Sequence, residues 1–221
     1  MVFEILTTSS AVKPNTGDII AEARKINPGL ISADRIAGGK CENVITPEQT
    51  IPEKPIAVPW ESCVTMGKFW SFHYDEKYKS SNELIRLLVD VVAKGGNLAL
   101  NVTPQPDGRL PREAVARMRK LGEWLKVNGE AIYSTRPLPP YRKGDWAFTR
   151  NRVTGEMYAI RLVKDGEVLE GKQIIPDVKP SKLIHVATGK EFSAAVTDEG
   201  VSVELPAGFA PESAADVFKL K

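Results

Sequence analysis

Residues 60–137 constrain the fold most, because strand-like and helix-like segments alternate along this stretch. In chain order the segments are a strand at residues 60–66, a helix opened by the capping box at residues 80–83 and ended by Gly95-Gly96, a strand at residues 97–102, and a helix that begins at Pro111 and ends at Asn128-Gly129. Strands that alternate with helices build a parallel sheet, and the loops at one end of such a sheet carry the functional groups. We therefore predict a parallel α/β layer with its functional face at the strand ends.

Each of the two helices has one apolar face. In the first helix the apolar residues Leu84, Leu88 and Val91 share a face. The charged residues of the opposite face, which we expect to be solvated, are Arg86, Asp90 and Lys94. In the second helix the residues expected to point inward are Val115, Met118, Leu121 and Leu125.

Upstream of this stretch the alternation continues in a weaker form. We expect short strands at residues 2–6 and 30–33, with a helix at residues 18–26 between them that the turn Asn27-Pro28-Gly29 ends. The second of these strands delivers Asp34 and Arg35 at its carboxyl end. Residues 36–59 contain several prolines and no apolar period, which predicts a long loop.

After Pro137 the character of the sequence changes. Pro137, Pro139 and Pro140 predict a linker. Beyond them, short apolar runs alternate with Gly, Asp and Pro turns at near-regular spacing and without a helical period. This pattern favours an antiparallel β-sandwich, which we interpret as an accessory domain at residues 138–221.

Composition excludes several classes of function. The 30 Lys+Arg nearly balance the 28 Asp+Glu, and no basic run is interleaved with aromatic residues, so nucleic acid is not expected as a partner. No apolar stretch approaches the ~20 residues that span a bilayer, so no membrane association is expected either. The first residues lack the basic and apolar regions of a signal peptide. Cys41 and Cys63 lack metal-ligand spacing, and we expect free or half-buried thiols, with a disulfide as the alternative.

A series of short motifs in a fixed order carries a resemblance to a known family. The motifs are Pro28-Gly29-Leu30-Ile31 with Asp34-Arg35, Thr46-Pro47-Glu48-Gln49, Trp60-Glu61, Gly95-Gly96-Asn97-Leu98, Pro106-Asp107-Gly108, Gly122-Glu123-Trp124-Leu125 and Ala131-Ile132-Tyr133. Pro-Asp-Gly alone is a common turn, but the whole series is specific. In this order it resembles the C-terminal half of α-L-fucosidases of glycoside hydrolase family 29.

The resemblance implies a fold and a reaction. It implies half of a (β/α)8 barrel at residues 1–137, because residues 1–135 hold at most four strand–helix units and a closed barrel needs eight. The family is similar in mechanism to other retaining glycosidases: an Asp attacks the anomeric carbon, and a Glu about 5–5.5 Å away acts as acid and then as base. The implied substrate is a fucosylated glycan or fucoside with a terminal α-L-fucosyl linkage, with no metal or organic cofactor. Family members are often secreted, periplasmic or lysosomal, and the sequence leaves the compartment open.

The motif match assigns roles to five residues. Glu48 is the best match for the catalytic acid/base, with a solvated loop carboxylate as the alternative, and Glu61 is the rival for the same role. Arg35 is the candidate for gripping the sugar or the catalytic carboxylates, against the alternative of an ordinary salt bridge. Trp60 and Trp70 are candidates for stacking on the sugar, against the alternative of closing the barrel mouth.

The position of the nucleophile departs from the family pattern. In the family this Asp precedes a Val-Arg-Pro-like segment, and counting back from Val12-Lys13-Pro14 places Thr8 at the same position. A threonine hydroxyl is un-ionised and no base is evident beside it, so we predict that the isolated chain does not hydrolyse fucosides.

Three hypotheses remain open. The chain is the C-terminal part of an α-L-fucosidase, present either as a fragment or as a degenerate gene product. Alternatively, it is a non-catalytic carbohydrate-binding or structural remnant of such an enzyme. The third hypothesis is an unrelated α/β protein whose sandwich mediates protein contacts. In the first two, an open barrel edge would favour self-association.

Overall fold

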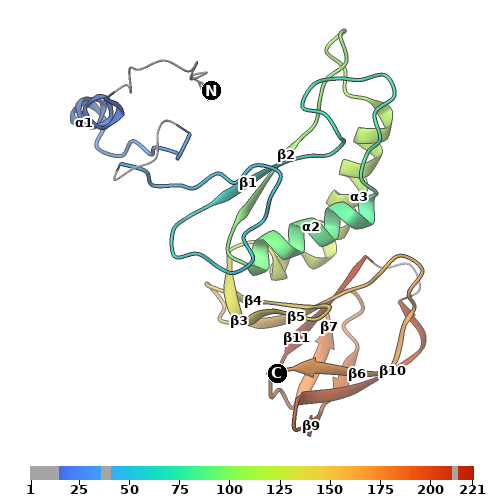
Figure 1. Ribbon diagram of the computed structural model, residues 1–221. Helices are drawn as coiled ribbons and strands as arrows, with labels where there is room; N and C mark the ends of the chain where they lie inside the picture. The colour runs from blue at the N-terminus through green and yellow to red at the C-terminus, as the bar shows by residue number, and fades with distance from the viewer. Residues whose placement is uncertain (1–14, 36–40, 211–213) are drawn as a thin grey trace.

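The computed structural model describes residues 15–35, 41–210 and 214–221, and its α/β part and its antiparallel part meet at the helices that follow the parallel strands (Figure 1). The α/β part contains the helices α1 (Thr16–Ile26), α2 (Ser81–Ala93) and α3 (Arg112–Asn128), the short helix η1 (Gly129–Ala131), and the strands β1 (Glu61–Thr65) and β2 (Asn97–Asn101). The expected strand at residues 2–6 and Thr8 lie outside the described residues. Within the described ranges, no helix combines the length and the apolar content that crossing a membrane requires.

Strands β1 and β2 pair in parallel, with Glu61 opposite Asn97 and Thr65 opposite Asn101. Isolated parallel bridges add two further segments to the same layer: Glu48 pairs with Cys63 and Ile45 with Trp60, and Ala33 pairs with Val44. Four chain segments therefore run side by side in one direction, and the predicted parallel α/β layer is confirmed. The segment at residues 44–48, which we expected to be loop, belongs to this layer.

Helix α2 forms as its capping box predicts. The Ser80 hydroxyl accepts from the Glu83 amide at 3.1 Å, and the Glu83 carboxylate accepts from the Ser80 amide at 2.6 Å. The charged face that we expected to be solvated is instead covered by the antiparallel part. Arg86 binds Asp165 through two hydrogen bonds and the Val163 carbonyl through a third.

Farther along the same face, Asp90 pairs with Lys94 and with Arg142 of the antiparallel part. The solvated-face prediction is wrong because helical spacing identifies a polar face but not the charged partners that another domain brings to it.

The antiparallel part is a pair of sheets. A six-stranded sheet has the order β3-β4-β5-β11-β7-β8, and a three-stranded sheet has the order β6-β10-β9. The strands are β3 (Thr135–Lys143), β4 (Trp146–Asn151), β5 (Met157–Leu162), β6 (Leu169–Pro176), β7 (Lys182–His185), β8 (Glu191–Ser193), β9 (Ala195–Thr197), β10 (Gly200–Ala210) and β11 (Ala215–Leu220). Residues of both sheets, among them Phe148, Phe218, Ile175 and Val203, share one buried apolar cluster. This arrangement is the predicted β-sandwich.

The proline-rich segment that we expected to be a linker is strand β3. Within the part of the chain that the structure describes, it is an edge strand of the six-stranded sheet and pairs only with β4, with an irregularity in register between Pro137 and Arg142. Proline lacks an amide proton, but an edge strand has one side without a partner strand, so it accommodates prolines that a central strand would not. The apolar runs after Pro140 predict strands at residues 146–150, 157–163, 183–186, 192–196, 201–205 and 216–220, and strand β6 is not among them.

A second apolar cluster joins the two parts. Ile85, Val89 and Ala93 of α2 pack with residues of β4, β5 and β11 such as Tyr158 and Val217. Trp124 of α3 contributes to the same cluster and donates its indole proton to the Ala215 carbonyl at 2.9 Å. The opposite side of α2 buries Leu84 with Met66 and Ala114 beneath the parallel layer. Helix α2 therefore packs apolar residues against both neighbours, beside the charged residues that it directs at the antiparallel part.

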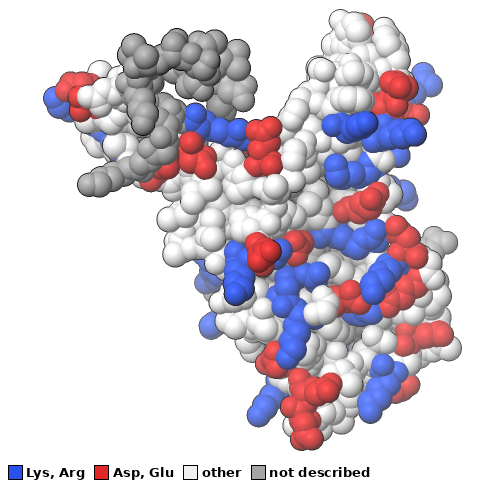
Figure 2. All heavy atoms as spheres, viewed as in Figure 1, with Lys and Arg blue, Asp and Glu red and all other residues white. Residues whose placement is uncertain are grey.

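The surface of the antiparallel part carries both signs of charge. Figure 2 shows basic and acidic side chains interspersed over the visible face of this part, consistent with a formal net charge of +2. Helix α1 lies apart from α2 and α3 (Figure 1), and of its apolar residues only Ile20 is buried, whereas Ile19 and Ile26 are 63% and 89% exposed.

Candidate functional site

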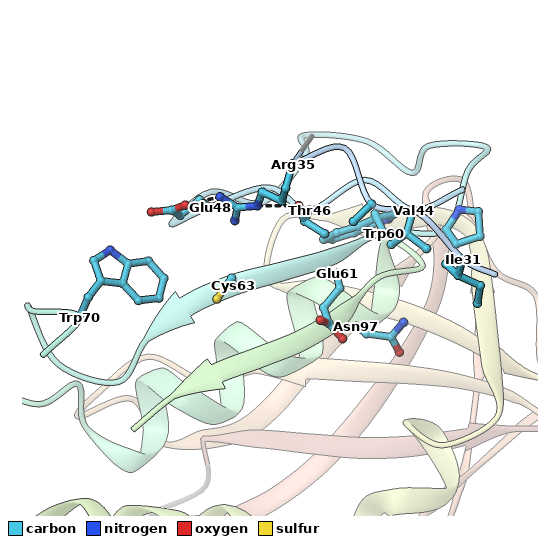
Figure 3. Close-up of a pocket in the computed structure, with 12 residues that line it drawn as sticks. Ile31, Arg35, Val44, Thr46, Glu48, Trp60, Glu61, Cys63, Trp70 and Asn97 are labelled. Atoms are coloured by element: carbon cyan, nitrogen blue, oxygen red, sulfur yellow. Dashed lines mark hydrogen bonds and ion pairs between the residues drawn. The ribbon is translucent and has the colours of Figure 1, made fainter. Parts of the chain in front are cut away.

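A cavity of about 880 Å³ lies on one face of the parallel layer (Figure 3). Most of its lining residues come from the four parallel segments at every second position: Ile31, Ala33 and Arg35; Val44, Thr46 and Glu48; Glu61 and Cys63; and Asn97. Side chains alternate between the two faces of a strand, so this spacing identifies the lining as one sheet face. The other face, with Val64 and Leu100, packs toward the helices.

The register of the bridges orders these residues into layers. Ala33 and Val44 form an apolar layer near the amino ends of the segments. One step toward the carboxyl ends, the same register places Arg35, Thr46, Glu61 and Asn97 at one level. Glu48 is a further step along, opposite Cys63. The cavity therefore changes from apolar to charged toward the carboxyl ends, where parallel α/β proteins place their active sites.

Arg35 and Glu48 form the central ion pair of the cavity. The Arg35 Nη1 and the Glu48 Oε2 are 2.6 Å apart, with the two side chains 31% and 43% exposed. Arg35 also donates from Nε to the Thr46 hydroxyl at 2.9 Å. The Asp34 carboxylate accepts a hydrogen bond from the Thr46 amide at 2.9 Å. The hydrogen bond to Glu48 raises the pKa of Arg35, so the guanidinium stays charged. At this exposure the pair contributes little to stability, but its hydrogen bond fixes how the Glu48 carboxylate lies in the cavity.

Cys63 lies close to these charges. Burial raises the pKa of its thiol, Arg35 opposes that rise, and the charges of Glu48 and Glu61 add to it. The thiol therefore stays protonated at neutral pH and is a poor nucleophile. Both cysteines are free and half-buried. Among the residues that the structure describes, no group of three His, Cys, Asp or Glu side chains is placed to bind a metal ion.

The two candidate acid/base residues occupy different levels of the cavity. Glu61 is the first residue of β1, and Glu48 is level with Cys63, two residues farther along. Two residues of a strand correspond to about 6.6 Å. Glu48 is therefore nearer than Glu61 to the carboxyl ends of the parallel segments by about that distance.

The two tryptophans differ in access to the cavity. Trp70 follows β1 on the loop toward α2 and is 43% exposed, with its ring facing the cavity in Figure 3. Trp60 borders the cavity, but its indole is 1% exposed and Gly96 lies against it. Trp60 is thus part of the wall, in line with the alternative of a closing aromatic, and only Trp70 offers an accessible ring.

All five residues singled out from the sequence line this cavity, namely Arg35, Glu48, Trp60, Glu61 and Trp70. Sequence reasoning missed Thr46, Cys63 and Asn97. Thr46 lies in the same motif as Glu48, and all three occupy alternate positions of parallel segments. For Thr46 this signal was hidden because the sequence predicts a loop at residues 44–48, whereas Cys63 and Asn97 lie in predicted strands whose inward face the sequence does not identify.

Comparison with known proteins gives these residues a context. The family model of alpha-L-fucosidase matches residues 7–130 of the chain. The chain belongs to the α-L-fucosidase family. An alpha-L-fucosidase from Dictyostelium discoideum is 32% identical over 170 residues, which is 70% of this chain and 36% of that protein. The plasma alpha-L-fucosidase of Rattus norvegicus is 40% identical over 99 residues, 43% of this chain and 20% of that protein.

Solved fucosidase structures agree with this assignment. The Thermotoga maritima α-fucosidase in complex with fucose aligns with a TM-score of 0.77 at 27% identity, over 95% of this chain and 49% of that chain. The α-L-fucosidase isoenzyme 1 of Paenibacillus thiaminolyticus shares the fold with a TM-score of 0.81 at 22% identity, over 94% of this chain and 53% of that chain. This fucosidase-family chain therefore spans about half of these structures and about a third or less of the curated relatives. The hypothesis of an unrelated α/β protein is overturned.

Proposed function

We propose that the chain supplies one half of the active site of a retaining α-L-fucosidase that acts on terminal α-L-fucosyl linkages. The observation that carries this proposal is the single sheet face on which Arg35 and Glu48 meet at the carboxyl ends of four parallel segments. The relative solved with fucose bound, of which the chain matches 49%, supports a fucoside as substrate.

The same alignment supports a partial barrel. We place half of a (β/α)8 barrel at residues 1–137 and the sandwich at residues 138–221, with the boundary inside β3. In the described residues β2 pairs only with β1, and the segment around Ala33 pairs only with the one around Val44. Ile31 at this edge is 70% exposed. Such an edge offers unpaired backbone groups and apolar side chains to a second polypeptide, and in its absence to another copy of the chain.

Glu48 is our choice for the acid/base because of its level in the cavity. A group that protonates the leaving oxygen must reach the sugar at the mouth of the barrel, at the carboxyl ends of the strands. Arg35 positions this carboxylate, Trp70 offers its ring to the apolar face of the sugar, and Trp60 shapes the wall. Glu61 is the alternative acid/base, one level deeper.

The nucleophile is the missing element. A retaining mechanism needs a second carboxylate about 5–5.5 Å from the first, and the matching sequence position holds Thr8. We therefore expect the isolated chain to bind fucosides weakly and to leave them intact. Thr8 also favours a second candidate function, a non-catalytic carbohydrate-binding remnant of the enzyme.

Complementation with a fragment of a related enzyme tests the proposal. The chain and its Thr8→Asp variant are assayed with an aryl α-L-fucoside, each alone and again after refolding with the part of the Thermotoga maritima enzyme that the chain does not match. We expect no turnover from either chain alone or from the complex that retains Thr8, and measurable turnover from the complex with Thr8→Asp, because only this complex holds both carboxylates. In the complex, Glu48→Gln should reduce kcat by about 100-fold or more, as loss of a general acid/base does. The matched control Glu53→Gln, a change at an exposed carboxylate away from the cavity, should leave kcat unchanged.

Each of the other outcomes has a defined meaning. Turnover by the chain alone contradicts the inactivity that Thr8 predicts. A loss of turnover in Glu61→Gln but not in Glu48→Gln moves the acid/base role to Glu61. Fucose binding by calorimetry without turnover in the complex favours the binding remnant.

A further inference from the structure

A second cavity, of about 380 Å³, lies beside the loop that connects β1 to α2. We call residues 67–79 the ring loop, because it carries a tryptophan and several other rings: Phe69, Trp70, Phe72, His73, Tyr74 and Tyr78. The opposite wall of the cavity is the loop after β2 and the start of α3, with Gln105, Arg109 and Arg112. Both loops follow the carboxyl ends of parallel strands, on the same side as Glu48.

The ring loop is held in place by its own polar contacts. The Glu76 carboxylate accepts from the amides of Lys68 at 2.7 Å and Phe69 at 3.2 Å. A Cβ on Gly67 would lie only 2.3 Å from the Glu76 side chain, so a larger residue there would displace this carboxylate. Lys79 ties the end of the loop to the Thr65 carbonyl at 2.7 Å. The rings are therefore preorganised, which lowers the entropic cost of binding a ligand.

The ring loop leaves one aromatic side chain largely exposed. Phe69 stacks on His73 with 3.8 Å between ring centroids, and Phe72 meets Tyr74 edge-on at 4.9 Å. Tyr74 is nevertheless 91% exposed. A large ring that contacts a neighbouring ring and is this exposed is a stacking surface of the kind that binding sites use.

The polar wall contains hydrogen-bonding side chains that bind no other described residue, including one basic and one acidic group. Among the described residues, the side chains of Gln105, Arg112 and Glu113 have no hydrogen-bonding partner within the protein, whereas Arg109 is paired with Asp107. An amide, a guanidinium and a carboxylate together match the donor and acceptor hydroxyls of a sugar. Basic and acidic groups balance along this wall, so a neutral ligand fits better than an ionic one.

We propose that this second cavity binds a neutral pyranose unit, a hexose or N-acetylhexosamine, of the glycan that carries the fucose. Tyr74 stacks on the ring of this sugar, and Gln105 and Arg112 bind its hydroxyls. The two cavities adjoin along the ring loop: Trp70 lines the first and Phe72 the second, and these Cα atoms are at most about 7 Å apart. The assignment of this sugar to the leaving-group side rests on the proposed fucosidase function.

Nuclear magnetic resonance titration of the intact chain tests the proposal with a fucose-free probe, N-acetyllactosamine. We expect shifts confined to the ring loop and to Gln105, and a dissociation constant that Tyr74→Ala weakens by about five- to tenfold, the loss expected for an aromatic contact. Gln105→Ala should weaken binding as well. The matched control is Tyr133→Ala, which removes a tyrosine that is 60% exposed but lies outside both cavities, and it should change nothing.

A separate titration with methyl α-L-fucoside, read at Cys63 and Arg35, reports on the first cavity. Disaccharide binding without fucoside binding supports the second site and contradicts the proposed function, whereas the reverse pattern overturns the second site alone. Absence of ring-loop shifts in excess disaccharide, or equal weakening by Tyr74→Ala and Tyr133→Ala, overturns it too.

Discussion

Gly96→Ala tests the packing that fixes the cavity wall. A Cβ built on Gly96 would lie 2.4–2.5 Å from three ring atoms of Trp60, and the indole is 1% exposed. Ordinary contact begins near 3.4 Å, so the ring or the backbone would have to move by about 1 Å. A buried ring has little room to move because protein interiors are close-packed.

The expected cost of this substitution follows from the overpacking. Inserting a methyl group into a packed site costs about 1–3 kcal/mol, and the clash with three atoms favours the middle of this range or above. Gly96 does not have a positive φ, so the cost is steric and not conformational. For a domain of this size, a loss of about 2 kcal/mol lowers Tm by roughly 4–8 °C.

Gly122→Ala is the matched control, because it makes the same chemical change in an open place. Gly122 lies inside α3, is exposed, and a Cβ there would meet no atom within 4 Å. Alanine in a helix interior is favoured over glycine by about 0.5–1 kcal/mol, so this variant should be more stable. If Gly96→Ala lowers the free energy of unfolding and Gly122→Ala raises it, the effect of packing is separated from the effect of helix propensity.

Urea and thermal denaturation followed by circular dichroism measure both variants. A double variant, Gly96→Ala with Trp60→Leu, isolates the contact: if the ring causes the cost, Gly96→Ala should cost less in the Trp60→Leu background than in the natural one. A Gly96→Ala variant as stable as the natural chain, or a cost that stays the same without the indole, would refute the packing argument and the assignment of Trp60 to the wall.

Three further perturbations probe other parts of the molecule. The Glu156 carboxylate is bound chiefly by Lys219, which lowers its pKa from 4.5 to about 2. The stability that this carboxylate gives the folded chain is therefore present above pH 4.5 and is lost as the pH falls through about 2. Glu156→Gln should lower the free energy of unfolding by about 1–2 kcal/mol at pH 7, after solvent screening, and should flatten the pH dependence of Tm in that window. Arg86→Ala should destabilise the chain more than Asp165→Ala in urea denaturation, because only the first also leaves the Val163 carbonyl without its donor, and equal effects would contradict this. Ile31→Lys should reduce self-association of the isolated chain in sedimentation velocity if the edge near Ala33 is the contact, and an unchanged profile would exclude that edge.

The helices whose first residues carry a capping signal were the predictable part of this fold. The capping box at Ser80 and Glu83 and the proline before α3 fixed where two helices begin, because these signals act through neighbouring backbone groups. The helix over α1 was predicted as well, but its apolar spacing did not predict burial: Ile26 is 89% exposed. Burial depends on what packs against a helix, and that information is absent from the helix itself.

The pairing of segments that are distant in the sequence was the part of the fold that could not be predicted. The segment at residues 44–48 contains Pro47 and looks like loop, yet it joins a parallel layer through bridges to Ala33, Trp60 and Cys63. Strand β3 was mistaken for a linker for a related reason, because its prolines forbid a central strand but not an edge strand. In both cases the deciding factor is the neighbour in space and not the residue.

The layered lining of the cavity connects the candidate site to the fold. Side chains at alternate positions of parallel segments share a face whatever their chemistry, so one register places Ala33 and Val44 at one level and carries Arg35 and Glu48 toward the carboxyl ends. A shift of one residue in any segment would turn its lining residues toward the helices, and a shift of two would move them by a full level. The meeting of Arg35 with Glu48 at 2.6 Å therefore depends on the register of the whole layer. Changes that loosen the wall at Trp60 should disturb this ion pair without touching either of its members.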